Sequence, residues 1–134
     1  MKVVYIAGKF RAGSHWGVVQ NVREAERVAL CVWRAGAAAL CPHLNCANFE
    51  GAMADSEWLA GGVELLRRCD AVVLLGNWVN SIGTKAEIVA ALEKGLPIFV
   101  EEEVSPNSDF QRNLPGGTRA GTWMDFLDWL RKEP

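Results

Sequence analysis

The sequence lacks a long hydrophobic run: its apolar stretches stay far below the roughly 18 residues that a membrane-spanning helix needs. The opening residues Met1 to Ile6 run directly into a strand-like pattern and lack the regions of a signal peptide. An excess of one charge is also missing, because 14 Lys and Arg stand against 16 Asp and Glu. This balance argues against a protein that holds phosphate backbones by charge. We therefore expect a cytoplasmic protein with no nucleic-acid or membrane partner.

Metal-binding patterns are scarce as well. The chain has two histidines and four cysteines, and no cysteine pair has the C-x-x-C spacing. The segment Cys41 to Cys46 lacks the second ligand pair of a zinc site. Each cysteine lies in or beside an apolar segment, where a free thiol behaves as a small hydrophobic group. We expect free cysteines in a reducing compartment, no metal and no other cofactor.

The length and composition predict a single domain. The 134 residues, 50% of them hydrophobic and 22% charged, are enough for one core without disulfide or metal support. We expect this domain to span residues 1–134. Six tryptophans are many for this length. They indicate either a well-filled core or a pocket or subunit interface, where tryptophan is favoured.

Short apolar runs alternate with helical patterns along the chain. We predict strands over 3–7, 37–40, 71–75 and 98–100. We predict helices over 18–35, 55–68 and 83–94, and a last helix that begins at 123. The helix over 83–94 is almost wholly apolar, so we expect it to be deeply buried.

Three stretches carry no such pattern. Residues 42–56 are predicted to form a long loop, after which Asp55 or Ser56 caps the next helix. Residues 101–122 are predicted to be irregular. The glutamates at 101–103 are predicted to form a solvated run.

This alternation of strands and helices is typical of a mostly parallel sheet that is covered on both faces. Right-handed crossovers leave few topologies. We predict an α/β fold, a flavodoxin-like (Rossmann-like) three-layer sandwich with four or five strands. Ligands of such sheets bind at the carboxyl ends of the strands, near the switch point. We therefore expect the site in the loops that follow Ala7, Leu40 and Leu75.

The segment from Ser81 to Glu87 follows a strand and opens a helix. Ser81, Gly83 and Thr84 bring hydroxyl and backbone N–H groups to the helix N-terminus, where anions bind readily. Glu87 lies one turn further, on a helix that is otherwise mostly apolar. One interpretation is a nucleophilic or acid–base carboxylate beside an anion pocket. The alternative is a solvent-facing glutamate that the helix dipole stabilises.

A second polar loop is expected at the same end of the sheet. Gly8 permits a close approach of the backbone, and Lys9 or Arg11 can pair with a phosphate; the alternative is a solvated basic loop. Tyr5, the only tyrosine, lies inside the first strand, and its hydroxyl needs a partner. His43 belongs to the same loop cluster and is a candidate for substrate binding, although a structural histidine is the commoner case.

Several motifs together carry a family resemblance over residues 2–100. They are Tyr5-Ile6-Ala7-Gly8, Asn21 with Ala25, Pro42-His43, Cys69-Asp70-Ala71-Val72-Val73-Leu74 and Ser81-x-Gly83-x-x-x-Glu87. The set resembles the nucleoside 2-deoxyribosyltransferase-like superfamily, and the Ser-x-Gly-x-x-x-Glu element is its most specific part. The sequence is particularly similar to the branch that cleaves the N-glycosidic bond of nucleoside 5′-monophosphates, and to its uncharacterised phage and bacterial relatives.

The resemblance implies a role for each of these residues. Glu87 would attack C1′ of the sugar and form a glycosyl-enzyme intermediate, and Tyr5 would orient it. Water or a second nucleobase would then resolve the intermediate. Such chemistry needs a carboxylate at an oxocarbenium-like centre.

The substrate contacts are also implied by the resemblance. Ser81 and Gly83 would bind the 5′-phosphate, while Gly8 and Arg11 would help to hold the phosphate or the sugar. The ligand would be a nucleotide or nucleoside, and the protein would form a homodimer or a larger homo-oligomer.

One departure from the family leaves alternatives open. Hydrolytic members carry an acidic residue on the second helix, and the matching position here is Gly62, with Asp55 and Glu64 out of register. Either the acid comes from elsewhere, or the chain is a non-catalytic binder or sensor of nucleotides that uses the same pocket. A third possibility is a structural or interaction protein in which Glu87 has no catalytic role.

Overall fold

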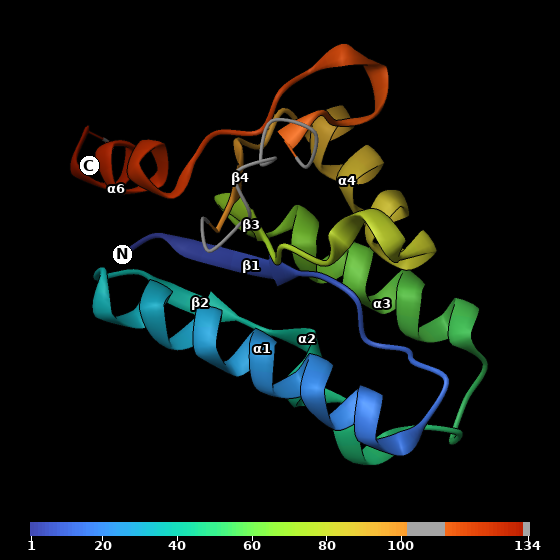
Figure 1. Ribbon diagram of the computed structural model, residues 1–134. Coiled ribbons are helices and arrows are strands. Elements are labelled where there is room, and N and C mark those ends of the chain that lie inside the picture. Colours follow the sequence, from blue (N-terminus) through green and yellow to red (C-terminus); the bar gives the residue numbers. More distant parts are fainter. Residues whose placement is uncertain (102–111, 133–134) are drawn as a thin grey trace.

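The sheet has four parallel strands in the order β2-β1-β3-β4, as the computed structural model in Figure 1 shows. The structure describes residues 1–101 and 112–132. The strands are β1 (Val3–Ala7), β2 (Ala38–Leu40), β3 (Ala71–Leu74) and β4 (Ile98–Val100). An all-parallel α/β sheet in a flavodoxin-like order confirms the predicted fold class.

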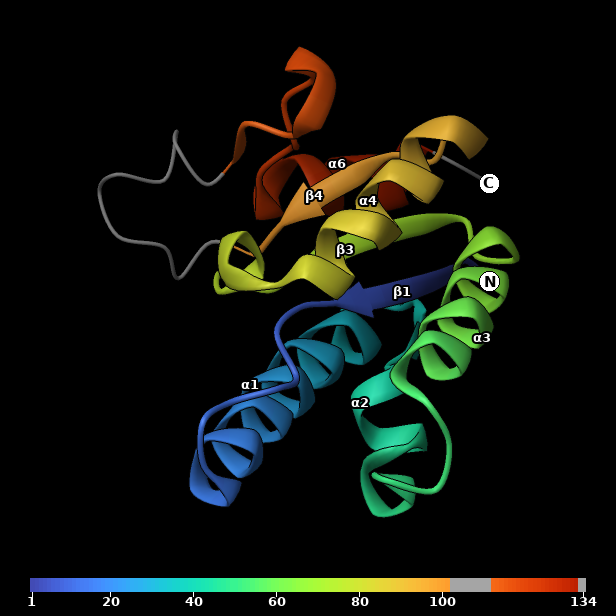
Figure 2. The same ribbon diagram turned by 90° about the vertical axis from the view of Figure 1, so that its right-hand side faces the viewer.

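Helices cover both faces of this sheet. They are α1 (His15–Arg34), α2 (Pro42–Asn45), α3 (Asp55–Arg67), α4 (Ile82–Lys94) and α6 (Trp123–Lys132). Helices α1 and α6 pack on one face, and α3 and α4 pack on the other. Figure 2 shows α1 and α3 on opposite sides of β1. The result is a three-layer sandwich with a separate apolar core on each face.

The strand residues alternate between these two cores. Val4 and Ile6 of β1 belong to the core under α1 and α6, whereas Tyr5 and Ala7 belong to the core under α3 and α4. The same alternation holds in β3, whose four residues are all buried. This burial on both faces is why the strands read as continuous apolar runs. It also fixes the direction of the Tyr5 side chain, which must point toward α3 and α4.

The topology places the loops of interest together. Strand β2 lies beside β1 at one edge of the sheet, whereas β3 and β4 follow on the other side of β1. The direction in which strands are added therefore reverses between β1 and β3. The segments that follow β1, β2 and β3 leave the same edge of the sheet, because all strands run parallel. The predicted site lies at this edge.

Two serines fix the starts of the helices that flank this edge. Ser14 caps α1 by accepting a hydrogen bond from the N–H of Gly17 at 3.1 Å, so α1 begins three residues before the predicted start. Ser81 caps α4 in the same way, by accepting from the N–H of Thr84 at 3.1 Å. The predicted cap of α3 is wrong, because Asp55 is already the first helical residue and Ala54 precedes it.

Three other local predictions are wrong. Residues 42–56 are not one long loop, because α2 and a 3-10 turn at Ala47–Phe49 lie within them. Helix α4 is buried on one side only, and Lys85, Val89 and Glu93 are exposed. Glu101 is not solvated: it is buried, and its carboxylate pairs with Arg27 of α1 at 2.8 Å. The neighbouring positions 102 and 103 lie outside the described residues.

Within the described ranges, no helix is both long and apolar enough to cross a membrane. In the same ranges no three His, Cys, Asp or Glu side chains gather as metal ligands. The four cysteines are free, and Cys41 and Cys69 are buried.

Candidate functional site

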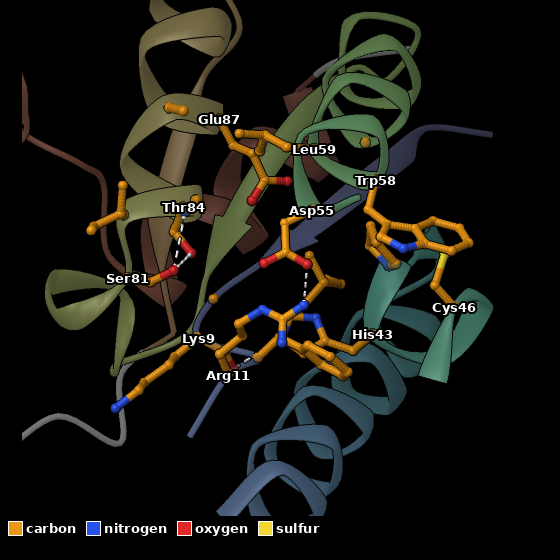
Figure 3. A pocket seen from close by; sticks show the side chains of 18 of the residues that line it. Lys9, Arg11, His43, Cys46, Asp55, Trp58, Leu59, Ser81, Thr84 and Glu87 are labelled. Carbon is orange, nitrogen blue, oxygen red and sulfur yellow. Dashed lines mark hydrogen bonds and ion pairs between the residues drawn. The ribbon is translucent and has the colours of Figure 1, made fainter. Parts of the chain in front are cut away.

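A pocket of about 740 Å³ opens at the carboxyl ends of the strands. Its wall includes the seven residues predicted to be catalytic or to bind substrate, which come from three separate stretches of the chain. They are Tyr5, Gly8, Arg11, His43, Ser81, Gly83 and Glu87. Figure 3 shows Glu87, Arg11, His43 and Ser81 around this space.

Tyr5 and Glu87 form the polar pair at the inner end of the pocket. The Tyr5 ring is fixed inside β1 with 1% of its surface exposed, and its hydroxyl donates a hydrogen bond to Oε2 of Glu87. Burial raises the pKa of the Glu87 carboxyl from 4.5 to about 7, although the hydrogen bond from Tyr5 lowers it. Burial, and then the charge of Glu87, raise the pKa of the Tyr5 hydroxyl, so this group stays protonated and remains a donor.

The bare backbone of Gly62, on α3, lies directly against this pair. A Cβ atom at position 62 would stand 2.9 Å from the Tyr5 hydroxyl and 3.8 Å from Oε2 of Glu87. The first contact is too short for any side chain to fit unless Tyr5 moves. Position 62 therefore adjoins the pair, as its predicted register implied, but it contributes no acid there.

The N-terminus of α4 forms another wall of the pocket. Thr84 is buried, and its hydroxyl donates a hydrogen bond to Oγ of Ser81 at 2.8 Å. The first N–H groups of any helix lack an intrahelical partner, and here the backbone at Gly83 lines the pocket. The nearest atom that a Cβ at Gly83 would meet lies 4.0 Å away, on Leu59. An anion can therefore approach these N–H groups.

The loop after β1 is held in place by three polar side chains. Asn77 accepts a hydrogen bond from the N–H of Lys9 at 2.9 Å, and Asn21 donates to the carbonyl of Phe10 at 3.0 Å. His43 contacts the carbonyl of Lys9 through Nε2 at 3.0 Å. A carbonyl only accepts, so Nε2 carries the proton. Burial lowers the pKa of His43, which keeps the ring neutral and Nδ1 unprotonated. His43 thus supports the loop in addition to lining the pocket.

Gly8 allows this loop to pass close to the neighbouring strand segment. A Cβ at position 8 would stand 2.4 Å from the Leu75 side chain, and Leu75 is fully buried. Only glycine fits at this crossing.

Arg11 contacts carboxylates across the mouth of the pocket. Its Nη2 forms an ion pair with Oδ1 of Asp55, at the start of α3, and its Nη1 lies 3.3 Å from Oε1 of Glu50. The other cation of this loop, Lys9, also lines the pocket, and in the described parts of the chain its ammonium has no carboxylate partner. Of the two loop cations, Lys9 is therefore the one that is open to an added anion.

The pocket also contains residues that were not predicted from the sequence to lie there. Asp55, Leu59 and Trp58 line the pocket from α3, and Phe10 lines it from the loop after β1. The Trp58 ring stacks on Phe49 with a centroid distance of 6.1 Å. One signal could have found the α3 residues: Asp55, Leu59 and Gly62 have the i, i+4, i+7 spacing of a single helix face.

A family model described as a domain of unknown function, DUF7768, matches residues 2–101. The chain belongs to this family. The match includes β1 to β4 and every pocket residue named above. The search of curated proteins finds no match.

Solved structures show where the DUF7768 fold is also found. A 2-deoxyribosyltransferase from Bacillus psychrosaccharolyticus is similar with a TM-score of 0.56 and 19% identity, covering 94% of this chain and 90% of that one. A conserved protein from Enterococcus faecalis V583 is similar with a TM-score of 0.56 and 23% identity, covering 99% of this chain and 76% of that one. The fold is that of the nucleoside 2-deoxyribosyltransferases, which confirms the predicted structural resemblance.

Proposed function

We propose that this protein cleaves the N-glycosidic bond of nucleoside 5′-monophosphates, with Glu87 as the nucleophile. The observation that carries the proposal is the pairing of Glu87 with Tyr5 at the inner end of a 740 Å³ pocket. A carboxyl group with a pKa of about 7 is largely ionised slightly above neutral pH, and burial makes its anion reactive. The fold shared with a 2-deoxyribosyltransferase supports the same class of chemistry.

The reaction proceeds in two displacements. The Glu87 carboxylate attacks C1′, the bond from C1′ to the base nitrogen breaks, and its electron pair leaves with the base, which takes a proton. Water then attacks C1′ of the glycosyl ester, releases the Glu87 carboxylate and gives up a proton. The products are a sugar 5-phosphate and a free base; a second base in place of water would give transfer. Tyr5 holds Glu87 throughout through its hydroxyl.

The 5′-phosphate is proposed to bind at the N-terminus of α4. Gly83 offers a backbone N–H there and no side chain to block the approach, and Ser81 offers a hydroxyl. Lys9 supplies the positive charge, because Arg11 is engaged by Asp55 and Glu50. Binding energy from a phosphate remote from C1′ helps to position the sugar against Glu87.

A second candidate function is nucleotide binding without cleavage. The observation that favours it is Gly62, which brings bare backbone to the Tyr5–Glu87 pair and no proton donor for the departing base. Cleavage by Glu87 then relies on water or on the substrate for that proton. The same residues would bind the nucleotide in either case.

Chromatography of free bases tests the proposal. The pure protein is incubated with each ribo- and deoxyribonucleoside 5′-monophosphate and with the matching nucleosides that lack phosphate. Release of base from at least one monophosphate, faster than from its nucleoside, is the expected result. Thermal shift is measured in parallel, since a ligand at 100 times its Kd stabilises by about 2.7 kcal/mol. A thermal shift without base release would favour the binding protein, and neither response would reject both functions.

A further inference from the structure

Helix α3 turns one face toward the pocket, and that face has a polar end and a bare end. Gly62 lies against Tyr5 and Glu87, where C1′ of a substrate would lie. Asp55 is seven residues earlier, at the first position of the helix, and Leu59 lies between them. Two helical turns separate Asp55 from Gly62 by roughly 10 Å along the axis. The Asp55 carboxylate therefore lies away from Gly62 along the helix, on the side where the base of a substrate would extend from C1′.

The surface between these two ends suits a flat apolar ring. Leu59 and Trp58 come from α3, Phe10 comes from the loop after β1, and Pro42 is the first residue of α2. The Trp58 ring is itself held by stacking on Phe49. Aromatic and aliphatic side chains of this kind bury the faces of a nucleobase, and a few polar groups at the end then decide which base fits.

The polar groups at that end include the carboxylate of Asp55 and the guanidinium of Arg11, which also contacts Glu50. Nη2 of Arg11 pairs with Oδ1 of Asp55, and Oδ2 has no hydrogen-bond partner within the described part of the chain. Figure 3 shows the Asp55 carboxylate pointing into the pocket between Glu87 and Arg11. A carboxylate oxygen only accepts and a guanidinium only donates. The pair therefore presents an acceptor next to a donor.

We propose that Asp55 and Arg11 read the outer edge of the base and select bases that carry a ring N–H beside a carbonyl. This inference rests on the proposed nucleotide substrate. The ring N–H donates to Asp55, and the carbonyl accepts from one of the guanidinium N–H groups of Arg11 that Asp55 and Glu50 leave free. Guanine, hypoxanthine, uracil and thymine present this edge. Adenine and cytosine instead present an unprotonated ring nitrogen beside an amino group.

The wrong base leaves both protein groups unpaired. Its ring nitrogen would direct a lone pair at the Asp55 carboxylate, and its amino group would direct N–H bonds at Arg11. The Arg11 and Asp55 side chains are 56% and 69% exposed without ligand, so the penalty arises when a bound base covers them. Polar groups that a ligand covers without pairing are costly, and a mismatched base edge changes kcat/KM by roughly ten- to a hundredfold. Asp55 and Arg11 therefore distinguish oxo bases from amino bases, and they do not distinguish purines from pyrimidines.

The test compares substrates that differ only at this edge. Values of kcat/KM are measured for inosine against adenosine monophosphate and for uridine against cytidine monophosphate, with wild type, Asp55→Asn and Glu64→Gln. Glu64 is an exposed carboxylate on the same helix, outside the pocket. We expect wild type and Glu64→Gln to favour the oxo member of each pair about tenfold or more. In Asp55→Asn the ratio should fall toward one or invert, because an amide both donates and accepts. If part of a variant fails to fold, both of its kcat/KM values fall by the same factor, so their ratio does not change.

Binding separates failure of this inference from failure of the proposed function. Calorimetry with Glu87→Gln gives Kd for the same four nucleotides without turnover, and Asp55→Asn is combined with it. An oxo preference in Kd that Asp55→Asn abolishes supports the inference even if no base is released by wild type. The inference would be overturned by equal Kd values for the oxo and amino nucleotides of each pair, or by a ratio of Kd values that Asp55→Asn leaves unchanged. It would also be overturned if none of the four nucleotides binds. Base release with equal ratios would overturn the inference and leave the proposed function standing.

Discussion

The hydroxyl of Tyr5 donates a hydrogen bond to Glu87, although the two residues are 82 positions apart in the sequence. Tyr5 points toward α4 because of its place in the alternation of β1, and Glu87 lies one turn into α4. The packing of α4 against the sheet therefore brings the Glu87 carboxylate to the Tyr5 hydroxyl. The hydrogen bond and the burial act in opposite directions on the pKa of Glu87, and burial prevails.

The activity of wild type should depend on pH through Glu87. The carboxyl must be ionised to attack C1′, and its pKa in the free protein is about 7. We expect kcat/KM to rise tenfold per pH unit below pH 7 and to level off above it. Initial rates of base release between pH 5 and 9 measure this profile. A plateau that begins near pH 4.5 would show that Glu87 titrates as an ordinary carboxyl or plays no part.

Removal of the Tyr5 hydroxyl should shift the same profile. In Tyr5→Phe the ionised form of Glu87 loses a hydrogen bond that is worth about 1.5–3 kcal/mol for a charged acceptor. The pKa of Glu87 should therefore rise by about one to two units. We expect the acid limb of the pH–rate profile to move up by that amount and the rate at pH 7 to fall by about five- to fiftyfold. An unmoved limb with a lower plateau would mean that Tyr5 acts in another way.

The stability of Glu87→Gln should exceed that of wild type above neutral pH. The folded protein binds the Glu87 proton with a pKa of about 7 and the unfolded chain with a pKa near 4.5. Wild type therefore loses stability as pH rises from 4.5 to 7, by up to about 3 kcal/mol, and does not regain it at higher pH. Glutamine carries no proton to lose.

Calorimetric unfolding of both proteins measures this difference. At pH 8 the Tm of Glu87→Gln should be several degrees higher than that of wild type, and the gap should narrow toward pH 4.5. A gap of the same size at both pH values would trace the effect to packing and not to charge.

Two adjacent glycines of α3 give a matched pair of variants. A Cβ at Gly62 would stand 2.9 Å from the buried Tyr5 hydroxyl, whereas a Cβ at Gly61 would meet nothing within 4 Å. Gly61→Ala should stabilise the protein by up to about 1 kcal/mol and leave activity unchanged. Gly62→Ala should lower kcat/KM at least tenfold because it displaces Tyr5. Thermal melts and base release compare the two, and equal activity would show that Tyr5 tolerates the displacement.

The sequence predicted the sheet well because burial on both faces leaves a continuous apolar run. All four strands lie where the runs predicted them, within one residue at each end. The same reasoning brought the loops after β1, β2 and β3 to one edge. The turns within residues 42–56 were missed because a helix of one turn, such as α2, shows no periodicity.

The contacts between distant residues could not be predicted. Glu101 was predicted to belong to a solvated run of glutamates, yet it pairs with Arg27, which is 74 residues away. Arg11 was predicted to pair with a phosphate, yet it pairs with Asp55, which is 44 residues away. A sequence shows which side chains are charged, and only the packing of α1 and α3 decides which charges meet.

The most direct test of the central claim compares base release by wild type with that by Glu87→Gln and Glu93→Gln. Glu93 is an exposed glutamate on the same helix, so its replacement controls for the substitution itself. With saturating nucleoside 5′-monophosphate at pH 8, wild type and Glu93→Gln should release base at equal rates. Glu87→Gln should be slower by roughly a thousandfold or more. Release by Glu87→Gln at the wild-type rate, or no release by wild type from any nucleotide, would contradict the account.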